Sequence, residues 1–249
     1  MKAMIFAAGL GTRLRPLTND RPKALVEIGG KTMLERVVIK LARAGFDDIT
    51  VNIHYFGEKI IEFLEQNNNF GLNIHISDER DMLLDTGGGI LKARPFLDGD
   101  EPFLVHNADI LTDIDLNAMY QSHVESGAMA TVLVKNRMTR RYFVFDDYYR
   151  LQGWINRSTG ETRPAGFVHR EGLHELAFGG IHVISPSIFE PLEVYSQGQA
   201  KFSITPFYVD ECHTHLIKGY VQDTPYNWLD VGKPETLKEA EDLVKAKDI

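Results

Sequence analysis

Short apolar runs alternate with amphipathic segments of helical period through the first 135 residues, and no other feature limits the possible folds as strongly. Residues 3–8 are wholly apolar, as expected of a strand buried on both faces of a sheet. Further strands are predicted over 49–53, 72–77, 103–106 and 128–134, and helices over 33–44, 58–66, 90–94 and 116–126. This alternation predicts an α/β fold whose mainly parallel sheet is doubly wound.

After residue 135 the pattern becomes richer in strands. The elements predicted there are a hairpin over 141–156, helices after Pro186 and Pro206, a strand over 216–222 and a terminal helix opened by Pro234. Neither a linker nor a repeat divides the chain. We therefore expect a single Rossmann-like domain over 1–249, in which residues 1–135 form one wall of a cleft and a β-rich insertion within 136–249 forms the other.

The composition is acidic, because 27 basic side chains face 35 acidic ones and give a formal charge of −8. A protein that binds duplex nucleic acid normally presents a basic face, so we expect no nucleic-acid partner.

The single cysteine, Cys212, excludes a disulfide framework and a cysteine-based zinc site. The apolar start is too short for a secretion signal, and no window approaches 18 uninterrupted apolar residues. We expect a cytoplasmic protein without a membrane partner.

The loop after the first predicted strand carries most of the chemistry of the N-terminal half. It reads AAGLGTRLRPLT over 7–18, with Pro22-Lys23 beyond it. Glycines let backbone N–H groups approach a phosphate chain closely, and Arg13, Arg15 and Lys23 concentrate positive charge in an acidic chain. A plain glycine turn between strand and helix is the competing interpretation, which the three basic residues and two prolines weaken.

Two better-known phosphate-binding loops do not match the sequence. A dinucleotide fingerprint requires a third glycine where this chain has Leu14. Gly30-Lys31-Thr32 resembles the end of a Walker A loop, but the first glycine of that motif would fall on Leu25. The loop therefore predicts a phosphate site of another kind.

Two aspartates stand where a sheet could present them to a ligand. Asp109 falls just beyond the apolar strand predicted over 103–106, at the edge where open α/β sheets bind ligands. Asp230 lies in an apolar stretch before the helix opened by Pro234. Each alone could cap a turn, but two carboxylates together suit Mg²⁺, which binds oxygen ligands and phosphates. We therefore predict that Asp109 and Asp230 hold one Mg²⁺ cofactor.

A longer pattern in the glycine-rich loop resembles the signature of sugar-1-phosphate nucleotidyltransferases, the NDP-sugar pyrophosphorylases. It reads G-x-G-T-R-L-x-P-L-T over 9–18 and is followed by Pro22-Lys23. The resemblance extends to W-x-D-x-G-x-P over 228–234, which contains Asp230. It implies an enzyme that joins a nucleoside triphosphate to a sugar-1-phosphate and releases pyrophosphate, with Mg²⁺ as cofactor and these two substrates as partners. The sequence does not indicate an oligomeric state.

The resemblance also implies roles for individual residues. Arg13 contacts the triphosphate and Lys23 contacts the α-phosphate or the sugar phosphate, so both are predicted to be catalytic. The implied nucleotide-binding residues are Ala8, Gly9, Gly11, Thr12, Arg13, Lys23, Gly87 and Gly88. The implied sugar-binding residues are Asn107, Gly179 and Gly180, and the implied metal ligands are Asp109 and Asp230.

The substrate pair is less closely specified. T-G-G-G-I over 86–90 and N-A-D-I-x-T-D over 107–113 look most like N-acetylmuramate-1-phosphate uridylyltransferases of cell-wall recycling. Mannose-1-phosphate or heptose-1-phosphate guanylyltransferases are the alternative. Many family members carry a Glu-Lys-Pro that contacts the sugar, and Thr162-Arg163-Pro164 stands in its place here, so the sequence leaves the identity of the sugar open. A non-catalytic nucleotide-sugar-sensing regulatory protein is a third interpretation, although such relatives often lose the Arg, Lys or Asp that this chain keeps.

Overall fold

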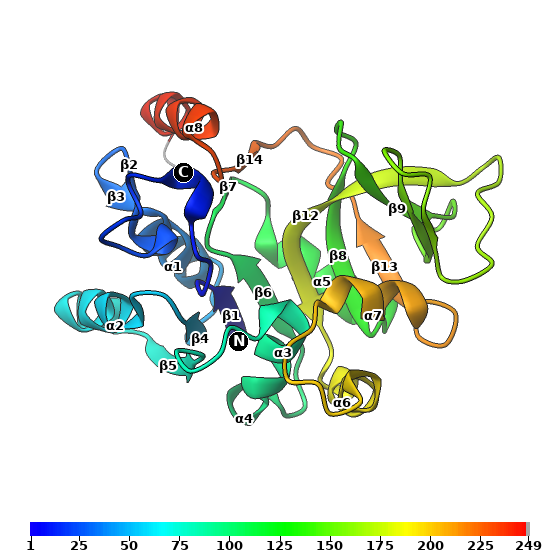
Figure 1. Ribbon diagram of the computed structural model, residues 1–249, viewed down its shortest axis with the longest axis horizontal. Coiled ribbons are helices and arrows are strands. Elements are labelled where there is room, and N and C mark those ends of the chain that lie inside the picture. Colours follow the sequence, from blue (N-terminus) through cyan, green and yellow to red (C-terminus); the bar gives the residue numbers. More distant parts are fainter. Residues whose placement is uncertain (248–249) are drawn as a thin grey trace.

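The computed structural model describes residues 1–247, and a ten-stranded mixed sheet runs through its centre (Figure 1). The strand order is β11-β10-β9-β12-β6-β1-β4-β5, and β8 pairs with β12 and carries β13 beyond it. The strands are β1 (Lys2–Phe6), β4 (Asp48–Ile53), β5 (Asn73–Asp78), β6 (Phe103–Asn107), β8 (Ala130–Lys135), β9 (Arg141–Phe145), β10 (Leu151–Asn156), β11 (Thr162–Arg163), β12 (His174–Ile184) and β13 (Ile217–Tyr220). The predicted α/β fold class is confirmed.

The parallel part of the sheet consists of β1, β4, β5 and β6, with the first apolar run at its centre. β1 pairs in parallel with β4 on one side and with β6 on the other. Its side chains alternate between the two faces, so that Ala3 and Ile5 join one hydrophobic cluster and Met4 joins another. A strand that is covered on both faces favours apolar side chains throughout, which explains the composition of residues 3–8.

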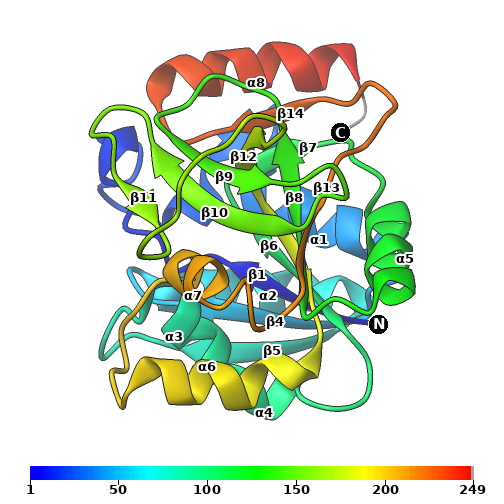
Figure 2. The same ribbon diagram turned by 90° about the vertical axis from the view of Figure 1, so that its right-hand side faces the viewer.

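Helices cover both faces of this sheet (Figures 1 and 2). Buried side chains place α1, α2 and α5 against one face and α3, α4, α6 and α7 against the other. The helices are α1 (Met33–Arg43), α2 (Gly57–Gln66), α3 (Asp85–Lys92), α4 (Arg94–Leu97), α5 (Leu116–Ser126), α6 (Phe189–Ser196) and α7 (Ile204–Asp210). The result is the three-layered arrangement that strand–helix alternation predicts.

Helix boundaries agree with the sequence at α1, which a polar cap begins, and differ at α3 and α7. Thr32 Oγ1 accepts the N–H of Glu35 at 3.0 Å and begins α1. By contrast, α3 begins at Asp85 and contains the three glycines that were expected to precede it. Likewise, α7 begins at Ile204, so Pro206 lies inside its first turn. The two helices pack against each other, and the N–H groups of Gly87 and Gly88 donate to the Phe202 carbonyl just before α7.

The β-rich insertion is joined to the parallel sheet by one long strand. The predicted hairpin is confirmed as the antiparallel pair β9–β10. Strand β12, which the sequence did not reveal as one element, pairs with β9 near its start and with β6 and β8 near its end. The insertion is therefore a continuation of the central sheet, and it stands beside the C-terminal end of β6.

A second feature missed by the sequence is a small layer above that edge of the sheet. Two short strands, β7 (Ile110–Thr112) and β14 (Trp228–Asp230), pair antiparallel. The terminal helix α8 (Pro234–Ala246), predicted from Pro234, covers them together with the hairpin of β2 (Glu27–Ile28) and β3 (Lys31–Thr32) (Figure 1). This layer brings the C-terminal segment next to the end of β6.

The connections leave a crevice where β1 and β6 end. From β1 the chain passes through α1 to β4 and on to β5, and then crosses to β6 on the opposite side of β1. Loops that leave neighbouring parallel strands in opposite directions create a ligand crevice at such a point. Within residues 1–247, no helix combines the length and the apolar character that crossing a membrane requires.

Candidate active site

The glycine-rich loop leaves β1 as a tight turn held by one threonine. Gly11 has a positive φ of 64°, and a Cβ there would lie 2.9 Å from Thr18 Cγ2. The Thr18 hydroxyl, fully buried, donates to the Gly11 carbonyl at 2.8 Å. Among the described residues, the backbone N–H groups of Gly9, Leu10 and Gly11 have no protein acceptor. They form a row of donors suited to a phosphate.

A buried polar pair supports this loop from the neighbouring strand, and the sequence analysis missed it. Asn52 Oδ1 accepts the N–H groups of Ala7 at 2.7 Å and Ala8 at 3.2 Å, while its Nδ2 donates to Glu79 Oε1 at 2.7 Å. Glu79 Oε2 in turn accepts the N–H of Leu84 at 3.0 Å. Burial raises the pKa of Glu79 above its usual range. A polar residue inside the apolar strand 49–53 is the signal that could have revealed Asn52.

Lys23 and Asp109 form an ion pair at the mouth of the crevice. Lys23 lies in the short 3-10 helix η2 (Lys23–Leu25), and Asp109 follows the end of β6, as predicted. The Lys23 ammonium donates to Asp109 Oδ2 in a partly buried contact. The structure thus brings one predicted catalytic cation and one predicted metal ligand together.

Asp230 reaches the same place through the β7–β14 pair. It lies opposite Ile110, and the N–H of Val231 donates to the Asp109 carbonyl at 2.9 Å. Its Oδ1 is buried and has no hydrogen-bond partner within residues 1–247. Burial raises the pKa of Asp230, and the neighbouring Asp109 carboxylate adds to that rise. The two predicted metal ligands are therefore neighbours: Asp230 ends β14, and Asp109 directly precedes β7, the strand that pairs with it.

Arg13 completes this group from the glycine-rich loop. A Cβ on Gly232 would lie 2.9 Å from Arg13 Nη2 and 2.7 Å from Asp230 Oδ1, so both side chains crowd over Gly232. The positive charges of Lys23 and Arg13 oppose the rise in the pKa of Asp230. Two carboxylates and two cations from three distant segments thus share one site.

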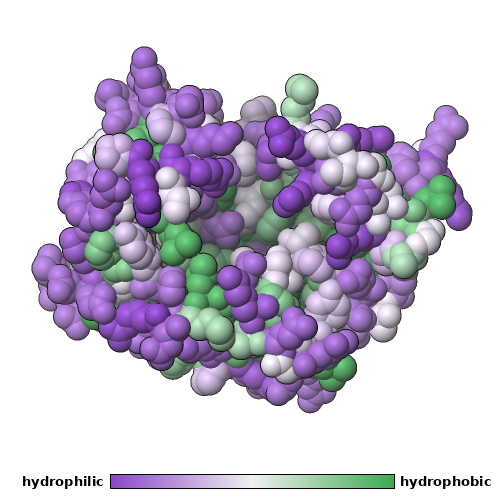
Figure 3. Space-filling model, viewed as in Figure 1, coloured by the Kyte–Doolittle hydropathy of each residue, from purple (hydrophilic) through white to green (hydrophobic). Residues whose placement is uncertain are grey.

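A pocket of about 200 Å³ lies next to these charges. Of the predicted residues, its lining contains Ala8, Gly9, Lys23, Asn107 and Asp109. Its far wall is formed by Asp85 and Thr86 at the start of α3, which the sequence analysis did not select. In the space-filling view the face is hollowed near its centre, between the N-terminal half and the β-rich insertion (Figure 3).

Gly87 and Gly88, predicted to bind the nucleotide, have a packing role in the structure. Their N–H groups donate to the carbonyl of Phe202 at 2.9 and 3.2 Å. A Cβ on Gly88 would come within 2.0 Å of the Ala200 carbonyl oxygen. These glycines therefore let the segment before α7 lie against α3, and their donors are already used. A contact between them and a nucleotide stays a prediction.

The predicted sugar-side residues lie together where β12 passes the end of β6, and we call this the sugar-side wall. Gly180 has a positive φ of 74°, and a Cβ there would lie 2.9 Å from Asn107 Nδ2. The carbonyl of Gly179 accepts the indole N–H of Trp228 at 2.8 Å. Strand β12 thus brings both glycines beside Asn107 and the β14 strand that carries Asp230.

The paired carboxylates satisfy what a hard divalent cation requires. Mg²⁺ uses one or two carboxylates and completes its coordination with phosphate oxygens and water. Asp109 and Asp230 supply two carboxylates, one with an orphaned buried oxygen. No cluster of three or more metal-ligating side chains occurs in the described part of the chain. The donor set therefore fits a cation that is shared with a phosphorylated substrate.

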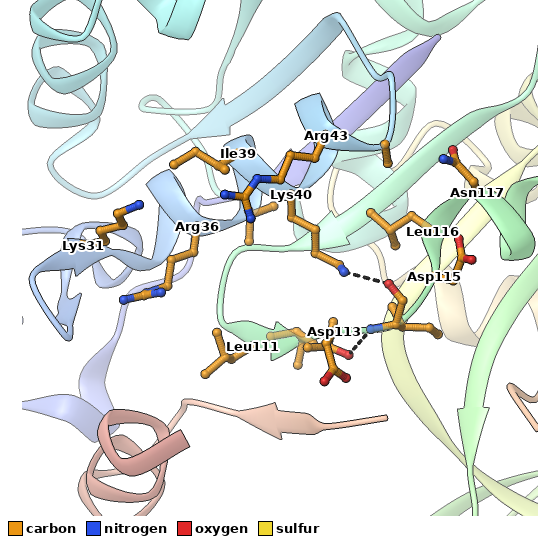
Figure 4. A pocket seen from close by; sticks show the side chains of 15 residues that line it. Lys31, Arg36, Ile39, Lys40, Arg43, Leu111, Asp113, Asp115, Leu116 and Asn117 are labelled. Atoms are coloured by element: carbon orange, nitrogen blue, oxygen red, sulfur yellow. Dashed lines mark hydrogen bonds between the residues drawn. The ribbon is translucent and has the colours of Figure 1, made fainter. Parts of the chain in front are cut away.

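Another hollow, of about 270 Å³, lies between α1 and the β7–α5 segment and contains none of the predicted residues (Figure 4). Lys40 crosses it and donates to the Ile114 carbonyl at 2.7 Å, and burial lowers the pKa of this lysine. The N–H of Ile114 donates to Thr112 Oγ1 at 3.2 Å. These contacts fix the segment that follows β7.

Comparison with known proteins agrees with this geometry. The family model described as nucleotidyl transferase matches residues 2–247. The chain is 34% identical over 248 residues to an N-acetylmuramate alpha-1-phosphate uridylyltransferase of Neisseria meningitidis serogroup B, with 99% of each chain covered. It is also 34% identical over 243 residues to a mannose-1-phosphate guanyltransferase of Schizosaccharomyces pombe. That alignment covers 94% of this chain and 62% of the relative.

Solved structures share the fold. HddC from Yersinia pseudotuberculosis, complexed with GMP-PN, superposes with a TM-score of 0.73 and 24% sequence identity over 99% of both chains. The family and the enzyme class predicted from the sequence, sugar-1-phosphate nucleotidyltransferase, are thereby confirmed. The chain belongs to the nucleotidyl transferase family.

Proposed function

We propose that this enzyme joins N-acetylmuramate 1-phosphate to UTP, giving a UDP-sugar and pyrophosphate. The observation that carries the proposal is the meeting of Asp109, Asp230, Lys23 and Arg13 beside the N–H groups of residues 9–11, which have no acceptor among residues 1–247. Two polyanionic substrates have to come together in this reaction. A site that mixes cations, backbone donors and a carboxylate pair suits that task.

The reaction is an in-line displacement at phosphorus. A phosphate oxygen of the sugar-1-phosphate attacks the α-phosphorus, the new P–O bond forms, and the bond to the bridging oxygen of pyrophosphate breaks. The main obstacle is repulsion, which amounts to roughly 4 kcal/mol for two unit charges 4 Å apart at an effective dielectric constant of 20. Arg13, Lys23 and the loop N–H groups lower this barrier by neutralising and orienting the phosphates. The attacking oxygen is already ionised, so the mechanism needs no general base.

Asp109 and Asp230 are the residues that would hold Mg²⁺. The bound ion would supply charge neutralisation and a fixed orientation for the phosphate groups. Lys23, which pairs with Asp109, would turn its ammonium to a substrate phosphate once that carboxylate has another cationic partner. Arg13, which lies close to Gly232 and Asp230, would contact the same phosphates.

The choice of UTP and N-acetylmuramate 1-phosphate rests on the Neisseria relative, which is similar over its whole length. A mannose-1-phosphate guanylyltransferase is the alternative. The Schizosaccharomyces relative that supports it is also 34% identical, but this chain covers only 62% of its length. Both share one reaction, so the site described above suits either pair.

A matrix of substrates tests the proposal. Purified protein with Mg²⁺ is mixed with each common nucleoside triphosphate and each of N-acetylmuramate, mannose, heptose and glucose 1-phosphates. Pyrophosphate release is measured, and the nucleotide sugar is identified by mass. We expect the highest kcat/KM for UTP with N-acetylmuramate 1-phosphate. A higher value for GTP with mannose or heptose 1-phosphate would assign the alternative function, and a lack of turnover with every pair would favour the sensor interpretation.

A further inference from the structure

A cation on the sugar-side wall has no part in the mechanism above. Arg137 follows the end of β8, and its guanidinium lies 4.4 Å from the ring centroid of Trp228. Its Nη2 donates to the Phe178 carbonyl at 3.0 Å. Its Nε is buried and finds no hydrogen-bond acceptor within residues 1–247. The side chain is thus firmly held, yet one of its donors is unused.

Strand β14 connects this cation to the carboxylate pair. Trp228 and Asp230 are two positions apart on one strand, so their side chains lie on the same face of it. The charge of Arg137 acts on Asp230 together with those of Lys23 and Arg13. Burial lowers the pKa of Arg137, as expected of a guanidinium held away from water.

Neighbouring cations of the β-rich half are engaged elsewhere. The Nζ of Lys135, two residues before Arg137, lies 4.6 Å from the ring centroid of Tyr226. Tyr226 is two residues farther from Asp230 in the sequence than Trp228 is. Arg163 Nε contacts Glu161 at 3.1 Å, and Arg157 Nε contacts Glu175 at 2.9 Å. Of these four, Arg137 is the one that lies against the strand carrying Asp230, and its charge favours the ionised form of that carboxyl.

We propose that Arg137 binds the phosphate of the sugar-1-phosphate and aligns it for attack, using the guanidinium fork that Trp228 holds in place. Arg13 and Lys23 then serve the triphosphate from one side of the carboxylate pair, and Arg137 serves the attacking phosphate from the other. Arginine suits this role because its planar fork can make two parallel hydrogen bonds to a phosphate. The inference rests on the proposed function, since it names a residue that binds one of its two substrates.

The test separates the two substrates. For Arg137→Met, KM for the sugar-1-phosphate should rise roughly 10- to 100-fold, the range expected for losing charge-assisted hydrogen bonds, while KM for the nucleoside triphosphate stays near the wild-type value. Arg137→Lys should recover part of this loss, because it restores the charge without the fork. Arg140→Met, three residues away on an exposed side chain, is the matched control and should match the wild type.

A purely structural role would have a different signature. Loosening Trp228 and the Phe178 segment would lower the melting temperature, would raise both KM values together, and would not be relieved by lysine. That pattern, or an unchanged KM for the sugar-1-phosphate, would overturn the inference. Calorimetric titration with N-acetylmuramate 1-phosphate and, separately, with UTP reads binding without turnover. Inactive wild-type enzyme would therefore count against the proposed function, while equal sugar-phosphate affinity of wild type and Arg137→Met would count against Arg137.

Discussion

Asn52 shows how a single buried side chain can shape a phosphate-binding loop. Its amide oxygen holds two backbone N–H groups where β1 ends, and its amide nitrogen is held by Glu79. The chain then turns away at Gly9, and its next N–H groups have no acceptor in the described part of the chain. The loop donors are available to a ligand because Asn52 has fixed the residues before them.

Replacing Asn52 by alanine should therefore lower stability. Two N–H groups and the Glu79 carboxyl would lose buried partners, and each unsatisfied group costs about 1–3 kcal/mol. We expect the free energy of unfolding in urea to fall by about 3 kcal/mol or more, the lower bound for three such groups. Asn117→Ala, on an exposed position of α5, should change it little. An equal effect of the two substitutions would contradict this account.

Asp109 carries a prediction about catalysis. Asp109→Asn keeps the shape of the side chain but removes the charge that pairs with Lys23 and lies beside Asp230. We expect kcat to fall by about a hundredfold or more, as when one electrostatic contact to the transition state is lost. Far-UV circular dichroism should stay unchanged. Asp147→Asn is the control, because that carboxylate is exposed and remote from the site. A kcat for Asp109→Asn within about threefold of the wild-type value would remove Asp109 from the site.

Strand β12 shows how one element can position residues on several others. It turns at Gly180 against Asn107, offers the Gly179 carbonyl to Trp228, and pairs with β6, β8 and β9. It also carries His182, whose Nδ1 lies 2.6 Å from the Tyr208 hydroxyl on α7. Burial lowers the pKa of His182 to about 3, so this side chain is neutral in the folded protein at neutral pH.

A pH dependence of stability follows from His182. Its folded pKa of about 3 lies below the usual value of 6.5, so between these values the unfolded chain binds more protons. The contribution of neutral His182 to stability is complete above about pH 6.5 and is lost as the pH falls toward 3. Between pH 7 and pH 5 the free energy of unfolding should fall by about 2 kcal/mol for this reason. His182→Asn should remove that part of the decline in urea unfolding, whereas the exposed His213→Asn should keep it. Parallel declines in both variants would show that another group is responsible.

At the scale of the whole molecule, the continuous sheet ties the two walls of the crevice together. β12 belongs to the second half of the chain and pairs directly with β6 of the first half. α8 adds a second link, because it packs over β14 and β7 from opposite halves. We propose on this basis that the chain forms one domain, as the absence of a linker in the sequence predicts.

One domain should unfold in one cooperative step. Far-UV circular dichroism reports on all helices, while the fluorescence of Trp154 on β10 and Trp228 on β14 reports on the insertion and on the site layer. Their urea transitions should coincide, because neither half keeps its core when the shared sheet is lost. An earlier fluorescence transition would show that the β-rich half unfolds separately. Trp154→Phe and Trp228→Phe assign the signal to each position.

The sequence by itself determined the alternation of strands and helices in the first half, the hairpin over 141–156 and the chemistry of the glycine-rich loop. These features are local, since side-chain period and the spacing of glycines and cations act within a few residues. It also indicated Asp109 and Asp230 individually, through their positions after an apolar run and inside a motif.

Only the tertiary structure decided which distant residues meet. β7 and β14 have three residues each, too few to show a period, yet their pairing brings Asp230 beside Asp109. The same holds for Asn52 with Glu79, and for Arg137 on Trp228. Such contacts depend on how the strands are ordered across the sheet, and local side-chain pattern carries no information about that order.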